Sequence, residues 1–600
     1  MTTKKSRFVM SGMVILAVLL TLGFAGAPNP AAADPPPPGQ RFILVAKSDA
    51  DFDALRADAT RAGGKILREM RELQTLIVSA PRSFKDQIKP SLHAQGVAQD
   101  RVRTLIRPGM NEEFFGASQA PQRTRIDMGS HGLKPKVKPD PASSLPGLMW
   151  NLMRIRAPQA WKLTTGDPAV KVGVADTGLD YTHSELASQV VEVKDFTVAE
   201  DPPLCKTYAG YSDQDASADF GGPVDTDWNG HGSWIGGNIA AALDGTGVNG
   251  IAPNVKLVAL KISQWCGSAY DSTILDAFYY AANNGIDVVS ISFGGYLDRS
   301  DPEQDLIYQQ YVAAAKYAQR KGTVIVAAAG NEHVRIGPGG LVLNHGDLTI
   351  PGDPLDDLYG LYELPGGIPG VVMVSATGNV VNGSSPSCPA GSFESSNATC
   401  KPASDAHQPT GIGKQNQLTY YSNYGPRIDV AAPGGARKFN LPSADRGGTP
   451  GWPVTTADGF NAWEDFSITS NWALQIPCYY DLGPEFYPGE CYSTIQGTSM
   501  ATPHASAVLA LIASRNRMAR HHPELLVTLL KMGAQRITGN TTPALSATDT
   551  SAGDLTGKLC NGGGDSAKAG YCHLGGRPIP DWEAYGAGLV DASNLLSWGH

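Results

Sequence analysis

The sequence predicts an α/β fold in which helices flank a central, mostly parallel sheet, preceded by a small α+β unit. From residue 148 onward, short apolar stretches alternate with helical stretches such as residues 272–282 and 306–319. The apolar stretches are nearly continuous, so both faces of each strand should be buried, as in a parallel sheet between helices. The expected strands comprise residues 170–175, 256–262, 286–293, 324–329, 371–376 and 428–432.

A separate small α+β unit is expected over residues 41–106. Gly63-Gly64 breaks the pattern between a helical stretch and the strand that follows it. The expected order is strand 41–45, helix 51–62, strands 65–67 and 73–78, and helix 83–93. By itself, this pattern indicates no particular function.

Two further segments have the composition of linkers. Residues 34–40 form a proline-rich spacer, and residues 107–147 are rich in Pro, Gly, Lys and Ser. Such segments are exposed and open to proteolysis. We therefore expect the main domain to comprise residues 148–600, with a maturation site in the linker before it.

Residues 1–33 have the pattern of a secretory signal peptide. Basic residues near the amino terminus precede an apolar run at residues 13–24, and small residues follow as far as Ala33. A retained membrane anchor is the alternative, but the run is shorter than the ~20 residues needed to cross a bilayer. We expect a secreted protein with no membrane association after signal removal.

Charge and cysteine content narrow the partners and the chemistry. The 600-residue chain has a net charge of −9 and no basic block, which argues against nucleic acid as a partner. Eight cysteines in an exported chain indicate disulfide bonds, although their connectivity stays open. Cysteines that are neighbours in the sequence would pair as Cys205–Cys266, Cys388–Cys400, Cys478–Cys491 and Cys560–Cys572. No Cys-x-x-Cys or His-Glu-x-x-His spacing supports zinc or thiol redox chemistry.

Ser499 is the first candidate catalytic residue. It lies in Gly497-Thr498-Ser499, directly before an Ala/Val/Leu-rich helical run. Pro503 fits the first turn of such a helix, where its missing N–H is not needed. Backbone N–H groups at a helix start favour an oxyanion formed beside Ser499. An ordinary N-cap turn is the alternative, so Ser499 needs catalytic partners.

Asp176 and His231 are the candidate partners. Asp176 follows the strand at residues 170–175, and carboxyl ends of parallel strands are where functional residues collect. His231 lies between Gly230 and Gly232 at the start of a small-residue helix. Either residue alone is compatible with a turn or a cap. The chain order Asp, His, Ser is that of the subtilisin triad.

These motifs resemble those of the subtilisin-like serine endopeptidases, the subtilases, over residues 148–600. The resemblance rests on Asp176-Thr177-Gly178, Asn229-Gly230-His231-Gly232 and residues 497–503. It implies a subtilisin-like fold, Asn331 as the oxyanion-hole amide, and a substrate-binding strand around Ser292, Phe293 and Gly294. Residues 585–592 resemble the segment that closes the family's catalytic domain.

The resemblance implies a secreted serine endopeptidase that cleaves proteins and peptides. Residues 41–106 would be a propeptide that assists folding and keeps a zymogen inactive as an intramolecular inhibitor, until cleavage in the linker. We expect a monomer that needs no cofactor for catalysis. Residues 243–248 resemble a shortened calcium loop, and Glu185 stands where an aspartate ligand is common, so structural calcium stays open and no metal ligand is assigned.

Some positions depart from the family pattern or lie outside it. Ser233 and Trp234 replace the usual Thr-His pair, and Trp234 could reshape a pocket beside the catalytic base. Asp180, His521 and His522 are interpreted as solvated. Residues 337–370, 379–420 and 435–493 form long insertions, either walls of the substrate cleft or surface loops.

Three other functions share parts of this pattern. An acyl transferase or peptide macrocyclase would use the same triad while excluding water from the acyl-enzyme. A noncatalytic secreted binding protein could use a subtilase scaffold, although the intact motif residues argue against it. An α/β-hydrolase esterase is disfavoured because Ser499 lacks the Gly-x-Ser-x-Gly elbow and the chain order differs.

Overall fold

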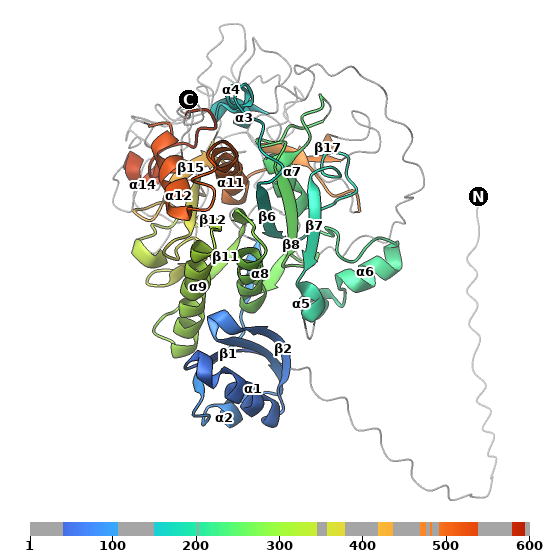
Figure 1. The fold of residues 1–600 in the computed structure, drawn as a ribbon, viewed down its shortest axis with the longest axis vertical. Helices are drawn as coiled ribbons and strands as arrows, with labels where there is room; N and C mark the ends of the chain where they lie inside the picture. Colours follow the sequence, from blue (N-terminus) through green and yellow to red (C-terminus); the bar gives the residue numbers. More distant parts are fainter. Residues whose placement is uncertain are drawn as a thin grey trace, which may run out of the picture. The chain divides into compact units, whose positions relative to one another are not determined.

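The computed structural model describes the chain in eleven segments and is drawn in Figure 1. These segments comprise residues 40–105, 149–200, 203–245, 247–344, 357–378, 418–419, 421–435, 468–475, 481–482, 491–537 and 579–594. The expected signal peptide, the linker and most of the long insertions lie outside them. Within them, no helix combines the length and apolarity needed to cross a membrane.

The amino-terminal unit, blue in Figure 1, has the expected strands and helices in the expected order, with a further strand after the second helix. Its elements are β1 (Gln40–Ala46), α1 (Phe52–Arg61), β2 (Lys65–Met70), β3 (Thr75–Ala80), α2 (Phe84–Ile88) and β4 (Ala94–Gln99). The antiparallel sheet has the strand order β2-β3-β1-β4. The second helix is shorter than predicted because Pro90 has no N–H with which to continue the helical hydrogen bonds beyond Lys89.

The centre of the main domain is a seven-stranded parallel sheet of strand order β15-β14-β12-β10-β6-β8-β7. Its strands are β6 (Lys171–Asp176), β7 (Val190–Asp195), β8 (Lys256–Lys261), β10 (Val288–Ile291), β12 (Val324–Ala328), β14 (Val372–Thr377) and β15 (Val430–Pro433). Six of these were predicted. The edge strand β7 was not, because its alternating, half-exposed sequence lacks the continuous apolar pattern.

Both faces of this sheet are buried, which explains its continuous apolar strands. Val288 and Val326 contribute to one core cluster, whereas Val289 and Ile325 contribute to the other. The first cluster includes residues of α7 (His231–Ala240) and α11 (Thr498–Arg515). The second includes residues of α8 (Asp271–Asn283) and α9 (Pro302–Arg320). Alternate side chains therefore pack against helices on opposite faces of the sheet.

The predicted strand at residues 286–293 is two strands instead of one. After β10, the chain leaves the main sheet and forms β11 (Phe293–Leu297) in a second sheet of order β13-β11-β5-β9. Here β5 (Val102–Leu105) pairs antiparallel with β11 on one side and with β9 (Ser268–Tyr270) on the other. The remaining strands are β13 (Tyr362–Leu364), β16 (Ile468–Asn471), β17 (Asp481–Leu482) and β18 (Tyr492–Ile495). The remaining helices are α3 (Trp150–Arg154), α4 (Ala157–Trp161), α5 (Leu204–Ala209), α6 (Asp213–Phe220), α12 (Pro523–Gly533) and α14 (Asp581–Tyr585).

One predicted disulfide lies within the described residues. Cys205, in α5, is bonded to Cys266, with a Cα–Cα distance of 5.4 Å. Cys491 is also disulfide-bonded, and its expected partner Cys478 lies outside the described residues. Both cysteines of the 388–400 and 560–572 pairs lie outside them too, so those pairings stay predictions.

Candidate active site

The structure brings Asp176 and His231 together. Asp176 is the last residue of β6, and His231 is the first residue of α7. The Nδ1 atom of His231 lies 2.8 Å from Oδ1 of Asp176, and each residue is 1% exposed. Oδ1 of Asp176 also accepts a hydrogen bond from the backbone N–H of Thr177 at 2.8 Å. This arrangement orients the imidazole and leaves its Nε2 atom at the opposite side of the ring.

Asp227 joins the turns that bear these two residues, and sequence reasoning missed it. Its Oδ1 accepts from the Thr177 hydroxyl at 2.9 Å and from the N–H groups of Asn229 and Gly230 at 2.9 and 2.8 Å. Its Oδ2 accepts from the N–H and hydroxyl of Ser233 at 2.8 and 2.7 Å. The available signal was an aspartate two residues before Asn-Gly, the pattern of a side chain that caps its own turn.

Lys261, the last residue of β8, contacts the same region. Its ammonium group is fully buried and donates to the carbonyl oxygens of Thr177 and Thr226 at 2.6 and 2.9 Å. It also forms an ion pair with Asp213 at 2.7 Å. Burial raises the pKa of Asp213 to about 6, although Lys261 acts in the opposite direction. The cation therefore compensates a buried carboxylate while fixing the residue after Asp176.

Ser499 is the second residue of α11, the helix that packs against α7. The sequence predicted Pro503 in the first turn of this helix, but it lies inside the helix. Because a proline has no N–H, it cannot donate to the carbonyl of Ser499 four residues earlier. The hydroxyl of Ser292 donates to that carbonyl instead, at 3.2 Å. Ser292, just before β11, is thereby joined to the turn that holds Ser499.

Asn331 is bound to the same turn from the carboxyl end of β12. Its Oδ1 accepts hydrogen bonds from the N–H and the hydroxyl of Thr498, both at 2.9 Å. These bonds fix the orientation of the amide, whose Nδ2 would lie 3.6 Å from a Cβ built on Gly497. The amide N–H₂ group therefore faces the turn just before Ser499.

The predicted substrate-binding strand already pairs with a segment of the amino-terminal unit. Phe293 and Gly294 lie opposite Leu105 and Thr104 of β5. On its other side, the N–H of Leu105 donates to the carbonyl of Gly267 at 2.9 Å. Because β5 is antiparallel to β11, its carboxyl end is directed toward Ser292. The strand therefore runs toward the turn that contains Ser499.

Two interpretations of neighbouring residues were wrong. Asp180 is fully buried, not solvated, and its carboxylate accepts from the N–H of Leu474 and the amide of Gln475 at 2.9 and 3.1 Å. Trp234 does not reshape a pocket, because it packs in the hydrophobic core and its indole N–H donates to the Ser493 carbonyl at 3.0 Å. In both cases the contact comes from a segment more than 250 positions away along the chain.

The side chain suggested as a calcium ligand is also buried and bound by protein groups. Oε1 of Glu185 accepts from the Tyr492 hydroxyl at 3.0 Å and from the N–H of Val248 at 3.3 Å. Donors directed at this oxygen compete with a cation for it. The described residues contain no group of three or more His, Cys, Asp or Glu side chains arranged to hold a metal. Structural calcium beside Glu185 therefore stays a prediction.

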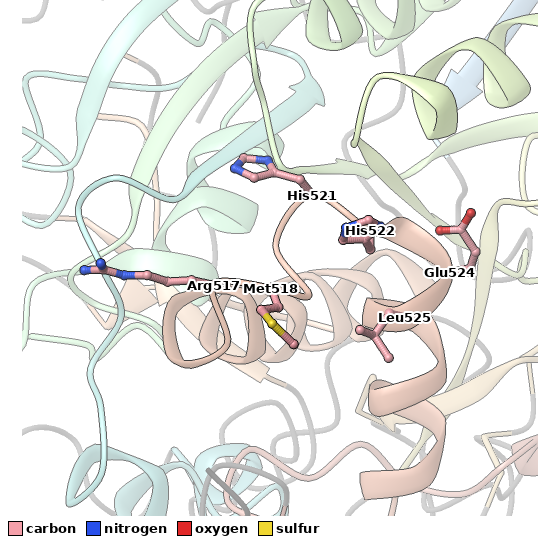
Figure 2. Close-up of a pocket in the computed structure, with 6 residues that line it drawn as sticks. All are labelled: Arg517, Met518, His521, His522, Glu524 and Leu525. Carbon is pink, nitrogen blue, oxygen red and sulfur yellow. The ribbon is translucent and has the colours of Figure 1, made fainter. Parts of the chain in front are cut away.

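A surface pocket lies beyond the other end of α11 (Figure 2). It is lined by Arg517, Met518, His521, His522, Glu524 and Leu525. Both histidines are exposed, as the sequence analysis expected. About 24 Å of helix separates Ser499 from the carboxyl end of α11, so the pocket beyond that end is not part of the candidate active site.

A family model described as the subtilase family, peptidase S8, matches residues 167–556. The chain belongs to the subtilase family. Thermitase from Thermoactinomyces vulgaris is 27% identical to this subtilase over 368 residues, covering 61% of this chain and 82% of thermitase. An intracellular serine protease from Paenibacillus polymyxa is 27% identical over 384 residues, covering 63% of this chain and 77% of that protein. The protein is therefore a subtilisin-like serine peptidase.

Solved structures share the fold of this subtilase. The epidermin leader peptide processing serine protease from Staphylococcus aureus has a TM-score of 0.57 at 18% identity, covering 94% of this chain and 98% of that one. Fervidolysin from Fervidobacterium pennivorans, a keratinolytic enzyme, has a TM-score of 0.52 at 19% identity, covering 93% and 61%. At these identities, the likeness establishes the subtilisin-like architecture.

Proposed function

We propose that this subtilase is a secreted endopeptidase that hydrolyses peptide bonds through an acyl-enzyme on Ser499. The observation that carries the proposal is the buried 2.8 Å contact between His231 Nδ1 and Asp176 Oδ1. With Nδ1 held by the carboxylate, Nε2 is the nitrogen available to take the proton of the Ser499 hydroxyl. Asp176 then stabilises the imidazolium, which returns the proton to the leaving amine.

In this proposal, Asn331 stabilises the oxyanion of the tetrahedral intermediate. The N–H of Ser499 at the start of α11 is the second donor, as expected for a helix terminus. The proposal is supported by the two hydrogen bonds from Thr498, which orient the Asn331 amide before any substrate arrives. A donor fixed in advance needs no reorganisation when charge develops. Water then hydrolyses the acyl-enzyme.

We further propose that residues 41–106 act as an inhibitory propeptide. The pairing of β5 between β11 and β9 supports this role, because an extended segment there occupies the place of a substrate strand. Cleavage in the linker at 107–147, after export directed by residues 1–33, would release the enzyme as a monomer. No step of this mechanism uses a metal ion, and bound calcium would act only on stability.

The test compares the secreted wild type with the Ser499→Ala variant. The wild type should lose about the first 110 to 150 residues and digest casein, a size that follows from the linker position. Ser499→Ala should stay unprocessed, with a turnover loss on the order of 10⁶, the size found for this change in subtilisin. Ser514→Ala, on the same helix, is the matched control and should mature normally. A processed, active Ser499→Ala protein would refute the proposal.

A further inference from the structure

Arg103, in β5, forms a buried ion pair with Asp271, the first residue of α8. Its Nε lies 2.7 Å from Oδ1 of Asp271, and its Nη2 lies 2.9 Å from Oδ2. Both side chains are withdrawn from solvent, with Arg103 5% exposed and Asp271 fully buried. The contact is bidentate, the geometry in which a guanidinium matches a carboxylate best. It joins the amino-terminal unit to the main domain.

The groups around this ion pair form a site shaped for a guanidinium. The remaining nitrogen, Nη1, donates to the carbonyl of Tyr296 at 3.0 Å. The hydroxyl of Tyr311 donates to Oδ1 of Asp271 at 2.7 Å, which holds the carboxylate in place. Gly295 leaves room for the arginine, because a Cβ there would lie 3.2 Å from Nη1 and 3.3 Å from Cδ. All of these partners belong to the main domain.

The register of β5 shows where this site lies along a bound strand. Leu105 is opposite Phe293, so the next residue of a strand in this register falls opposite Ser292, whose hydroxyl contacts the Ser499 carbonyl. For a substrate bound as a strand in this register, we take that next residue to supply the scissile carbonyl, because it lies opposite the residue that contacts Ser499. Arg103 stands two residues before Leu105 and thus occupies the fourth position before the bond to be cleaved.

We propose that Asp271 is a specificity-determining residue that selects arginine at the fourth position before the scissile bond of protein substrates. The inference rests on the proposed function and names the substrate class of the same site. A bound arginine pairs with the carboxylate through Nε and Nη2 and donates to the Tyr296 carbonyl through Nη1. An uncharged residue leaves Asp271 in the covered site without a cation, and such a partner loss is costly. Lysine supplies charge but not the bidentate geometry, so it should be an intermediate substrate.

The test uses the full chain, expressed with its own amino-terminal unit, and the purified active product. Its substrates are acetyl-Arg-Thr-Leu-Ile coumarin amide, which copies the sequence at residues 103–106, and the same peptide with lysine, citrulline or methionine in first place. Citrulline matches arginine in shape but has no charge. We expect kcat/KM to fall at least about thirtyfold from arginine to citrulline, with lysine between them. Equal rates for arginine and citrulline would overturn the inference.

The Asp271→Asn variant assigns the preference to this residue. It should hydrolyse the citrulline and methionine peptides faster than the wild type, because no carboxylate is then left without a cation, and it should lose most of the arginine preference. Asp276→Asn is the matched control on the same helix, since Asp276 pairs with Arg68 of the amino-terminal unit and not with Arg103. It should keep the full preference. Arginine selectivity that survives Asp271→Asn would overturn the assignment.

Failure of the inference can be told apart from failure of the proposed function. If peptides are cleaved at Ser499-dependent rates but without regard to arginine, only the specificity is wrong. If no peptide is cleaved and casein is untouched, the endopeptidase activity itself is wrong. Should Asp271→Asn fail to fold, the peptide series on the wild type still decides the arginine preference.

Discussion

The Asp227→Asn substitution tests the support of the candidate active site most sharply. The wild-type carboxylate accepts five hydrogen bonds, three at Oδ1 and two at Oδ2. An asparagine has one oxygen, so its N–H₂ group must face at least one backbone N–H. The fewest donors lose their acceptor if that group faces Ser233, because the Ser233 hydroxyl can rotate to accept, whereas the Ser233 N–H can only donate. The Ser233 N–H and one N–H of the asparagine are then buried without an acceptor.

The expected magnitudes follow from that count. Each unsatisfied buried donor costs about 1–3 kcal/mol, so the free energy of unfolding should fall by about 2–6 kcal/mol for the two donors. The turns that bear Asp176 and His231 would also lose a common anchor. Displacements approaching 1 Å cost about 100-fold, so kcat should fall about 10- to 100-fold with little change in KM. The reason is that Asp227 contacts no substrate.

The assay separates stability from turnover. Unfolding in urea is compared between Ser499→Ala chains with and without Asp227→Asn, because self-digestion is then avoided. Turnover is measured in chains with Ser499 intact, after active-site titration. Asp225→Asn is the matched control, since that half-buried carboxylate accepts a single bond from the Tyr181 hydroxyl at 2.8 Å. The reasoning would be refuted if the free energy of unfolding of the Asp227→Asn protein lay within about 0.5 kcal/mol of its parent's and its kcat within about twofold.

Three further predictions use the same assays. Asn331→Asp keeps the oxygen that accepts from Thr498 but loses the amide donor, so kcat should fall about 10²- to 10³-fold at nearly constant KM; equal losses in KM would contradict the oxyanion role. Lys261→Met leaves Asp213 buried without its cation and should lower the free energy of unfolding by about 3–5 kcal/mol, whereas a change below about 1 kcal/mol would contradict it. Burial lowers the pKa of His504 to about 4. As the pH falls, this histidine is therefore protonated in the unfolded chain before it is protonated in the folded one, so its contribution to stability is fully present above pH ~6.5 and should be lost toward pH 4. His504→Gln should make that part of the pH profile flatter, and an unchanged slope would contradict the assignment.

The sequence predicted those parts of the fold that depend on local pattern. Continuous apolar stretches identified β6, β10 and β12 because both faces of the sheet are covered by helices. Edge strand β7 escaped this rule, since none of its residues is fully buried. The glycine-containing turns before His231 and Ser499 also predicted where α7 and α11 begin.

The parts that depend on distant segments could not be predicted. Asp180 looked like a solvated loop residue, but Leu474 and Gln475 cover it from 294 and 295 positions away. Asp227 accepts donors from two separate turns, and no periodicity indicates that convergence. The partner of Arg103 lies 168 positions further along, so the ion pair becomes visible only in the fold.

The most direct test of the central claim is to find the residue that a fluorophosphonate modifies in the active product. The activated serine attacks phosphorus and expels fluoride, which leaves a stable phosphonate ester, and the modified residue is located by peptide mass spectrometry. The account predicts a single label on Ser499, loss of caseinolysis in proportion to labelling, and no label in a folded His231→Ala protein. A label on another residue, or full activity after Ser499 is modified, would contradict the account.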